Sequence, residues 1–362
     1  MALKRQLAAL VAAAASATLI AGCSSSDTGP AAGAPSSQGS LVLVDGDSHG
    51  YITFDTDREV LSGYTRDGKK MWQEKRYFPT DVHCAAACPD AAISATVDMN
   101  KSASESHVVW KHGESSTTQP FTEKSLVVQW ARSKDTWVAT SESSIIWSDG
   151  GKTHTKPFPK GISDSMGRVS ADNTTLLISV QQNSGAPWSA FRFPLTGEHL
   201  SPSSISTGLP GSVGCLSPEQ GTMWTLGDRA SEFSLTTGKK IRDTAQFASD
   251  CASSDTSTML GAFSASSDES TQEISITSGS RSTPFKKVSV KSAGEIGLFR
   301  DCSVLLSNGK LTTFSAQGKK TETEIGAHSL LTLPDGQIYS VGSSGKMEQH
   351  TIAAKGRNCR IS

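Results

Sequence analysis

The residues of this chain best suited to chemistry are one histidine and two cysteines that lie within six positions of each other. His83 and Cys84 are adjacent, and Cys88 follows directly before Pro89. Thiolate and imidazole are ligands that suit Cu(I), so this arrangement could form a copper or redox site. The same two cysteines could instead form a disulfide that closes a small loop. We favour the structural disulfide and keep a copper or redox carrier as a minor alternative.

Other catalytic patterns are absent from the sequence. It contains no GxSxG, HExxH or Walker A motif. The eight histidines are scattered, and none stands at a metal-ligand spacing from another. We therefore expect no catalytic, cofactor-binding or metal-binding residue and interpret the chain as a non-enzyme. Sequence spacing does not test a site assembled from distant segments.

The composition is that of a chain built mainly from short strands and turns. It has 36% hydrophobic and 19% charged residues, with 32 glycines. No long apolar stripe of helical period follows residue 22. Lys and Arg number 34 against 35 Asp and Glu, a net charge of -1. Nucleic-acid binding usually leaves a basic imbalance or patch, so we expect no nucleic-acid partner.

Residues 1–22 have the pattern of an export signal. Lys4 and Arg5 precede an apolar stretch from Leu7 to Leu19. This stretch is shorter than the roughly 20 apolar residues that a membrane-spanning helix needs. The following Ile20-Ala21-Gly22-Cys23 resembles a lipobox, the signature of bacterial lipoproteins, with Ile20 where Leu is usual. That resemblance implies cleavage before Cys23 and lipid attachment to its sulfur.

Residues 23–40 are expected to form a flexible linker after the anchor. The stretch from 24 to 40 has no large apolar side chain. Such a segment cannot bury enough surface to offset the entropy lost on ordering. We therefore divide the chain into a signal peptide (1–22), a lipid-anchored linker (23–40) and a folded domain (41–362).

The folded domain repeats a unit of about forty residues. Each unit has an apolar segment, an acidic turn residue and a second β-rich segment. The acidic residues are Asp45, Asp90, Asp135, Asp172, Glu219, Asp255, Asp301 and Asp335. Their spacing averages about 41 residues, as in the blades of a β-propeller.

A second marker, a glycine expected in a turn, also occurs once in each of the eight units. A turn glycine follows each acidic residue: Gly68, Gly113, Gly151, Gly197, Gly238, Gly279, Gly318 and Gly356. If the four strands of a unit are named A to D in chain order, the acidic residues suit the A–B turn and the glycines the C–D turn. The sequence therefore predicts an all-β fold, a single propeller of about eight four-stranded blades. Seven blades are the alternative, if residues 327–362 share a blade with the first strands.

Some turns carry a family resemblance. TRDGKKMW, LTTGKKI and the turn at Pro334-Asp335-Gly336 resemble the quinoprotein-type (PQQ-like, YVTN-like) propeller repeat. In that family a Trp four residues after the turn glycine docks neighbouring blades, but here only Trp72 obeys the rule. This departure argues against a quinone-dependent dehydrogenase. A lipid anchor with an eight-bladed ring also resembles the lipoprotein propeller of outer-membrane protein assembly machinery.

The six cysteines other than Cys23 allow fifteen pairings, and the repeat register favours one of them. Cys215 and Cys251 each stand four residues before the acidic residue of consecutive units, so they should lie on adjacent A strands. Cys84 and Cys88 could close a small loop, which leaves Cys302 with Cys359. An even number of cysteines in an exported chain indicates disulfides.

The expected topology places the loops on two faces. A–B and C–D turns share one end of the ring, with acidic residues near the axis and lysines farther out: Lys69, Lys70, Lys152, Lys239, Lys240, Lys319 and Lys320. The other end should carry longer connections at 100–106, 181–187, 200–211 and 263–271. Loops on a rigid scaffold often carry function, so we expect the partner surface there. Trp188 is its candidate anchor, although a buried blade tryptophan is the stronger interpretation.

The leading functional hypothesis is a binding or scaffolding module of the cell envelope. It would be exported and anchored through Cys23 to the outer face of the cell membrane or to the outer membrane. Its partner would be an envelope protein or a cell-wall polymer. The alternative is an envelope hydrolase or lyase with its site at the propeller funnel, which predicts several close carboxylates or histidines with shifted pKa values.

Overall fold

A computed structural model describes most of the chain from Leu41 to Ile361. The residues left undescribed in this range are 76–80, 86–87, 98–105, 114, 124–125, 159–163, 171–173, 218–219, 245–246, 254–257, 266–271, 280–285, 292–294, 300–301, 308, 316–318, 333–336, 343–346 and 356–357. The predicted signal peptide, the linker and Cys23 also lie outside the described residues.

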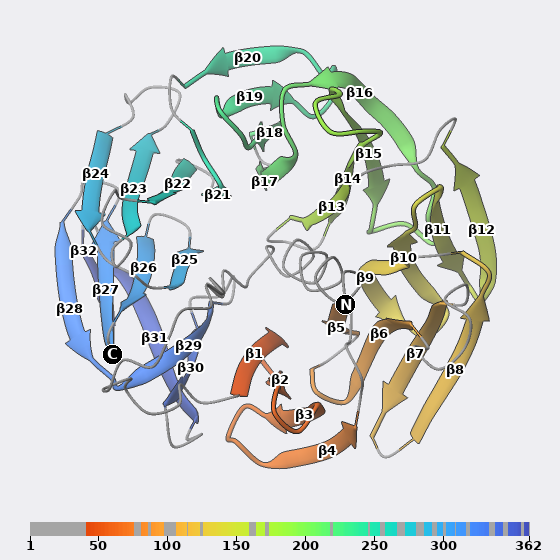
Figure 1. Cartoon of the computed structure of the whole chain (residues 1–362), viewed down its shortest axis with the longest axis horizontal. Helices are drawn as coiled ribbons and strands as arrows, with labels where there is room; N and C mark the ends of the chain where they lie inside the picture. The colour runs from red at the N-terminus through yellow and green to blue at the C-terminus, as the bar shows by residue number, and fades with distance from the viewer. Residues whose placement is uncertain are drawn as a thin grey trace, which may run out of the picture.

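The described residues form eight four-stranded antiparallel sheets arranged as a ring (Figure 1). Within each sheet, the four strands follow one another in the sequence. This is the all-β propeller that the forty-residue period predicts. In the part of the chain that is described, no helix has the length and apolar character needed to cross a membrane.

The first four blades run from residue 41 to residue 209. Blade 1 contains β1 (Leu41–Gly46), β2 (Gly50–Asp55), β3 (Val60–Thr65) and β4 (Lys70–Lys75). Blade 2 contains β5 (Asp81–Cys84), β6 (Ala91–Val97), β7 (Ser106–His112) and β8 (Ser115–Phe121). Blade 3 contains β9 (Val127–Ser133), β10 (Thr136–Thr140), β11 (Ser144–Asp149) and β12 (Lys152–Pro157). Blade 4 contains β13 (Asp164–Val169), β14 (Thr175–Gln181), β15 (Trp188–Pro194) and β16 (Ser203–Leu209).

The remaining four blades complete the circle. Blade 5 contains β17 (Val213–Ser217), β18 (Thr222–Thr225), β19 (Ser231–Ser234) and β20 (Lys240–Asp243). Blade 6 contains β21 (Asp250–Ser253), β22 (Thr258–Ala265), β23 (Gln272–Gly279) and β24 (Lys286–Lys291). Blade 7 contains β25 (Glu295–Phe299), β26 (Cys302–Ser307), β27 (Lys310–Ser315) and β28 (Lys320–Glu324). Blade 8 contains β29 (Ala327–Thr332), β30 (Gln337–Gly342), β31 (Met347–Lys355) and β32 (Asn358–Ile361).

The ring closes through its innermost strands. β1, β5, β9, β13, β17, β21, β25 and β29 contact one another in this order, and β29 contacts β1. The first and last blades are separate sheets, so the expected alternative of a shared blade does not occur. Radial repetition of this kind leaves only short, protected strand edges.

The hydrophobic core is divided into clusters that lie between neighbouring blades. Leu176, Ile178 and Val180 of β14 pack with residues of blade 3, while Leu177 of the same strand packs with residues of blade 5. Because both faces of this strand are covered, its first six residues are all buried and its sequence, TLLISVQ, has no regular alternation of apolar and polar residues. Each blade is therefore stabilised mainly by its neighbours.

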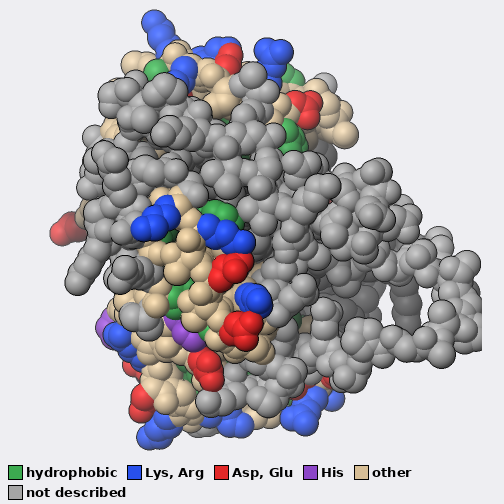
Figure 2. All heavy atoms as spheres, turned by 90° about the vertical axis from the view of Figure 1, so that its left-hand side faces the viewer, with side chains coloured by type: hydrophobic (Ala, Val, Ile, Leu, Met, Phe, Trp, Pro, Cys, Tyr) green, Lys and Arg blue, Asp and Glu red, His purple; other side chains and the backbone are tan. Residues whose placement is uncertain are grey.

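The outer strands have the opposite pattern. β12 and β28 alternate between exposed and half-buried residues. One prediction fails here, because Ser203–Leu209 of the expected loop 200–211 forms strand β16. The Ser-rich sequence of this strand suggested a loop. Strands at the rim of the ring carry polar residues because most of their surface faces water. Figure 2 shows the resulting surface, with basic and acidic side chains interspersed.

Most of the described turn markers lie in the turns that the repeat predicted, whereas Asp45 and Gly279 lie at the ends of strands β1 and β23. Asp90 and Asp135 lie in A–B turns, and Asp45 is the penultimate residue of β1. Gly68 and Gly238 lie in C–D turns with φ angles of 84° and 65°, a conformation that glycine adopts without strain. The acidic residues of the other five units, and the glycines at 318 and 356, lie outside the described residues.

Candidate functional site

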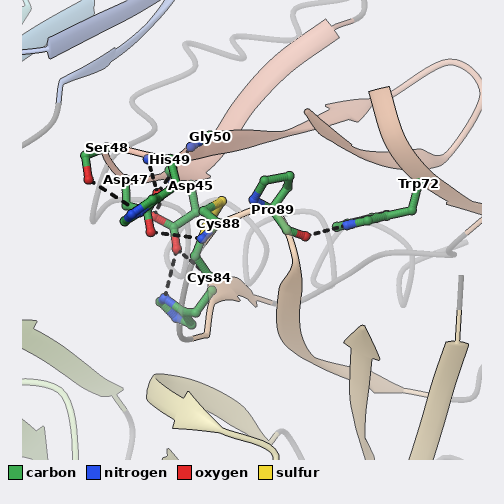
Figure 3. Close-up of a disulfide and its surroundings, with 11 residues drawn as sticks. Asp45, Asp47, Ser48, His49, Gly50, Trp72, Cys84, Cys88 and Pro89 are labelled. Carbon is green, nitrogen blue, oxygen red and sulfur yellow. Dashed lines mark hydrogen bonds and ion pairs between the residues drawn. A yellow bond between two sulfur atoms is a disulfide. The ribbon is translucent and has the colours of Figure 1, made fainter. Parts of the chain in front are cut away.

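The richest cluster of functional groups lies where blades 1 and 2 meet. We call it the blade 1–2 junction and define it by Asp45, Asp47, Cys84 and Cys88, which are labelled in Figure 3, together with His83. The local cause is a bulge in β1, whose pairing with β2 shifts between Leu43 and Asp45. A bulge changes the direction of the side chains that follow it, and here it aims Asp45 at the next blade.

Two carboxylates of blade 1 hold the cysteine loop of blade 2. The backbone N–H of Cys84 donates to Oδ2 of Asp45 at 2.7 Å, and the N–H of Cys88 donates to Oδ2 of Asp47 at 2.9 Å. Oδ1 of Asp47 accepts from the N–H groups of His49 and Gly50 in its own turn. Each carboxylate therefore satisfies backbone donors on two blades, which fixes the loop against its neighbour.

The two cysteines of the junction are bonded to each other. Cys84 and Cys88 form a disulfide with their Cα atoms 5.0 Å apart, and Cys88 is fully buried. A sulfur atom in a disulfide is not a thiolate. In this form Cys84 and Cys88 do not offer the thiolate ligands that the hypothesis of a copper or redox carrier requires. Among the described residues, no group of three or more His, Cys, Asp or Glu side chains is arranged to hold a metal ion.

His83 connects the junction to a third blade. Its Nε2 lies 2.8 Å from the carbonyl oxygen of Val128 on β9, and a carbonyl only accepts, so Nε2 carries the proton. The other ring nitrogen, Nδ1, lies 3.8 Å from Oδ2 of Asp45. His83 thereby bridges blades 1, 2 and 3 near the axis.

The Asp45 carboxylate sits in an unusual electrostatic environment. Burial raises its pKa above the ordinary value of 3.8, because water is removed from the charged form. His83 and the N–H groups of Cys84 and Gly46 act in the opposite direction. Many protein atoms surround the Asp45 carboxylate, and 31% of the surface of this side chain is still exposed to solvent. Both carboxylates accept hydrogen bonds from backbone N–H groups of the cysteine loop, so the arrangement supports the contact between the two blades.

Trp72 closes the outer side of the same contact. Its Nε1 donates to the carbonyl oxygen of Pro89 at 2.6 Å, and its ring packs beside Val82, Cys88 and Ala92. The indole lies over Gly63 on β3, where an added Cβ would come within 2.4 Å of the ring. Trp72 thus makes the blade-to-blade contact that the resemblance to quinoprotein repeats implied.

The other two disulfides join blades. Cys215 of β17 pairs with Cys251 of β21, so the bond links adjacent innermost strands of blades 5 and 6. Cys302 of β26 pairs with Cys359 of β32 and ties the last strand to blade 7. All three pairs are those expected from the sequence: the repeat register indicated Cys215–Cys251, closeness in the chain indicated Cys84–Cys88, and Cys302–Cys359 remained.

Trp188 does not form the expected surface anchor. It is the first residue of β15, half-buried, and its ring packs against the buried cluster between blades 4 and 5. The structure therefore supports the alternative interpretation, a packing tryptophan. The described large hydrophobic residues that are exposed are Met71, Ile241 and Phe247, outside the 181–187 loop.

The carboxylates and histidines with raised or lowered pKa values do not gather at one funnel. Burial raises the pKa of Asp164 on β13, and burial lowers the pKa of His350 on β31. Asp164, His350 and Asp45 lie on blades 4, 8 and 1, respectively. An open depression of about 380 Å³ is lined by Thr122, Glu123, Glu142 and Ser143.

The closed ring of four-stranded sheets defines the class of fold, a single β-propeller of eight blades. No protein-family model matches the chain, and no curated protein resembles it in sequence. Solved structures do resemble it. BamB from Moraxella catarrhalis is 12% identical, with a TM-score of 0.56 over 85% of this chain and 95% of that one.

Two further solved structures show the same likeness. The computationally designed protein Ika8 is 10% identical with a TM-score of 0.56, over 87% of this chain and 98% of that one. The Dos1 propeller is 10% identical with a TM-score of 0.51, over 87% and 93%. At these identities the comparison establishes the fold alone.

Proposed function

We propose that this protein is an exported lipoprotein whose propeller is a binding or scaffolding module of the cell envelope. Lipid on Cys23 would anchor it to the outer face of the cell membrane or to the outer membrane, and residues 23–40 would act as the linker. Its partner would be an envelope protein or a cell-wall polymer. The basic leader followed by an apolar stretch and the lipobox-like Ile20-Ala21-Gly22-Cys23 support the anchor.

The observation that carries the proposal is the closed and covalently stapled ring. Eight A strands contact in a circle, and disulfides cross the interfaces of blades 5 with 6 and 7 with 8. A rigid ring holds its connecting turns in fixed relative positions, so a partner can bind them with little ordering cost. Three disulfides also agree with an oxidising compartment outside the cytoplasm.

The anchor is tested by metabolic labelling with radioactive palmitate. Wild-type protein should take up the label and sediment with membranes, whereas the Cys23→Ala variant should do neither. A Cys359→Ala variant controls for general loss of a cysteine and should remain labelled. Equal labelling of the Cys23→Ala variant and the wild type would contradict the anchor.

The binding role is tested by chemical crosslinking in intact cells, followed by mass spectrometry of the purified full chain. We expect a specific envelope partner to be recovered with the wild type. The Trp188→Ala variant should recover the same partner, because Trp188 packs between blades rather than at the surface. Recovery of no specific partner would contradict the binding role.

A further inference from the structure

The imidazole ring of His83 faces a hydrogen-bond acceptor on each side. Its Nε2 lies 2.8 Å from the carbonyl oxygen of Val128 on β9, and its Nδ1 lies 3.8 Å from Oδ2 of Asp45 on β1. A neutral imidazole carries one N–H group, and the carbonyl of Val128 accepts it. Nδ1 therefore presents a lone pair to a carboxylate oxygen, and at 3.8 Å the two atoms form no hydrogen bond.

One added proton completes this arrangement. On Nδ1 it makes an imidazolium ion, which donates to Val128 on one side and pairs with the Asp45 carboxylate on the other. On Asp45 it makes a carboxylic acid whose O–H can donate to Nδ1. In both positions the proton lies between blade 1 and blade 2, while Nε2 keeps its contact with blade 3.

Histidines are the cations available to the two carboxylates of the junction. Within the described part of the chain, Asp45 pairs with His83, and Asp47 pairs with His49 at 3.4 Å. No lysine or arginine that the structure describes forms an ion pair with either carboxylate. Histidine is the side chain that ordinarily gains its charge between about pH 5 and pH 8. The charge balance of the junction therefore depends on pH in that range.

Few other ionisable groups surround His83. Strand β6, which pairs with β5, carries none. The charged or titratable side chains described on the other elements around β5 are Asp45 of β1, Asp47 and His49 of the A–B turn of blade 1, Asp90 of the A–B turn of blade 2 and Arg132 of β9. Arg132 lies over the ring of Trp130, 5.6 Å from its centroid, and Asp90 is exposed. His49 is 67% exposed, so its pair with Asp47 contributes little.

Water can deliver the proton to the pair. About a third of each side chain is exposed, 33% for His83 and 31% for Asp45. Burial among protein atoms raises the pKa of Asp45, and this favours proton uptake at the same place.

The proton acts on a part of the ring that no disulfide joins. Disulfides cross from blade 5 to blade 6 and from blade 7 to blade 8, whereas the bond between Cys84 and Cys88 lies within blade 2. The cysteine loop is held to blade 1 by its N–H groups, which donate to Asp45 and Asp47 (Figure 3). A change of charge at Asp45 therefore reaches this loop directly.

We propose that Asp45 and His83 form a proton-dependent contact that holds blades 1, 2 and 3 together. With the proton bound, the cysteine loop stays on the A–B turn of blade 1; without it, the loop opens more often. Because the protonated form is the more stable one, the contact is strongest at mildly acid pH and weakens as the pH rises toward 8. The proposal concerns the ring itself and does not depend on the binding role proposed above.

The test is hydrogen exchange of the full chain in non-ionic detergent, measured by mass spectrometry between about pH 5.5 and pH 8. Exchange rates of residues 81–93 are divided by the intrinsic rates at each pH, so that the remaining difference reports the opening of the loop. His83→Gln removes the titrating ring and keeps an amide N–H for the carbonyl of Val128. Asp45→Asn removes the same proton site from blade 1. The matched control is His199→Gln, because His199 pairs with Asp149 at 3.0 Å between blades 3 and 4.

We expect the protection of residues 81–93 in the wild type to fall about three- to fivefold from pH 5.5 to pH 8, as for the loss of one partly exposed ion pair. The His199→Gln control should show the same fall, whereas His83→Gln and Asp45→Asn should show nearly constant protection. A constant protection in the wild type, or an unchanged fall in both junction variants, would overturn the proposal. So would a fall that disappears in His49→Gln and persists in His83→Gln, because the exposed pair with Asp47 would then be the proton site.

Discussion

Replacing Trp72 should show how much one blade contact contributes to the ring. In the Trp72→Phe variant the indole N–H is lost, and the buried carbonyl oxygen of Pro89 is left without the donor that stands at 2.6 Å in the wild type. An unsatisfied buried polar group costs about 1–3 kcal/mol. The smaller ring also loses buried apolar area, roughly 40 Å², which adds about 1 kcal/mol.

The expected loss of unfolding free energy is therefore about 2–4 kcal/mol for Trp72→Phe. Trp72→Ala also empties the space between Gly63 and Val82 and should cost about 3–5 kcal/mol. Trp188→Phe is the matched control. That indole is half-buried and has no hydrogen bond in the described part of the structure, so the change should cost under about 1.5 kcal/mol.

The assay is guanidinium unfolding of the full chain in detergent, followed by far-ultraviolet circular dichroism, with reversibility checked by refolding. The midpoint of Trp72→Phe should shift clearly below that of Trp188→Phe, without a change of slope. If both variants lose the same stability, the hydrogen bond to Pro89 does not hold blades 1 and 2 together, and the reasoning is refuted.

Three further perturbations follow from the described contacts. Replacing Cys302 and Cys359 by serine opens a loop of 57 residues, which should cost about 4 kcal/mol of unfolding free energy in the chain-entropy model. The denaturation midpoint should fall accordingly, and an unchanged midpoint would contradict a role of this disulfide in holding blade 8 to blade 7. Gly50→Ala would place a Cβ 2.2 Å from a backbone carbonyl of β3 and should cost about 1–3 kcal/mol, whereas Gly197→Ala, where the nearest atom is the carbonyl oxygen of His199 at an ordinary contact distance of 3.6 Å, should be nearly neutral in the same assay. Burial holds the pKa of Asp45 above 3.8, so the folded protein keeps this proton to higher pH than the unfolded chain, and stability falls as pH rises through that range. Asp45→Asn should flatten this dependence in melting curves recorded between about pH 3 and pH 6; an unchanged dependence would assign it to other groups.

The repeat made most of the fold predictable. Turns of fixed chemistry recur in each unit, and Asp135 and Gly151 lie in the A–B and C–D turns that their residue types predict. The same register placed Cys215 and Cys251 on adjacent A strands, because equivalent positions of consecutive blades face each other. Periodicity therefore carries information about long-range contacts whenever both partners belong to the repeat.

Features that occur once were harder to predict. The hydrogen bonds from the cysteine loop to Asp45 and Asp47 join residues 39 and 41 positions apart in the sequence. They depend on a β-bulge in β1 that the sequence pattern does not indicate. The contact of His83 with Val128 likewise joins blades 2 and 3 through a single ring nitrogen. Strand β16 was interpreted as a loop because its Ser-rich sequence, SSISTGL, lacks the alternation of apolar and polar residues that a half-buried strand shows.

That the ring is a binding module of the envelope is tested most directly by site-specific photo-crosslinking in living cells. A photoreactive residue would be placed at positions 69, 152, 239 and 319 in the C–D turns of one face, and at 58, 229 and 310 near the B–C turns of the opposite face. A specific adduct from one of the two faces, identified by mass spectrometry, is the expected result. The absence of any specific adduct from both faces, with the protein correctly anchored and folded, would contradict the binding role.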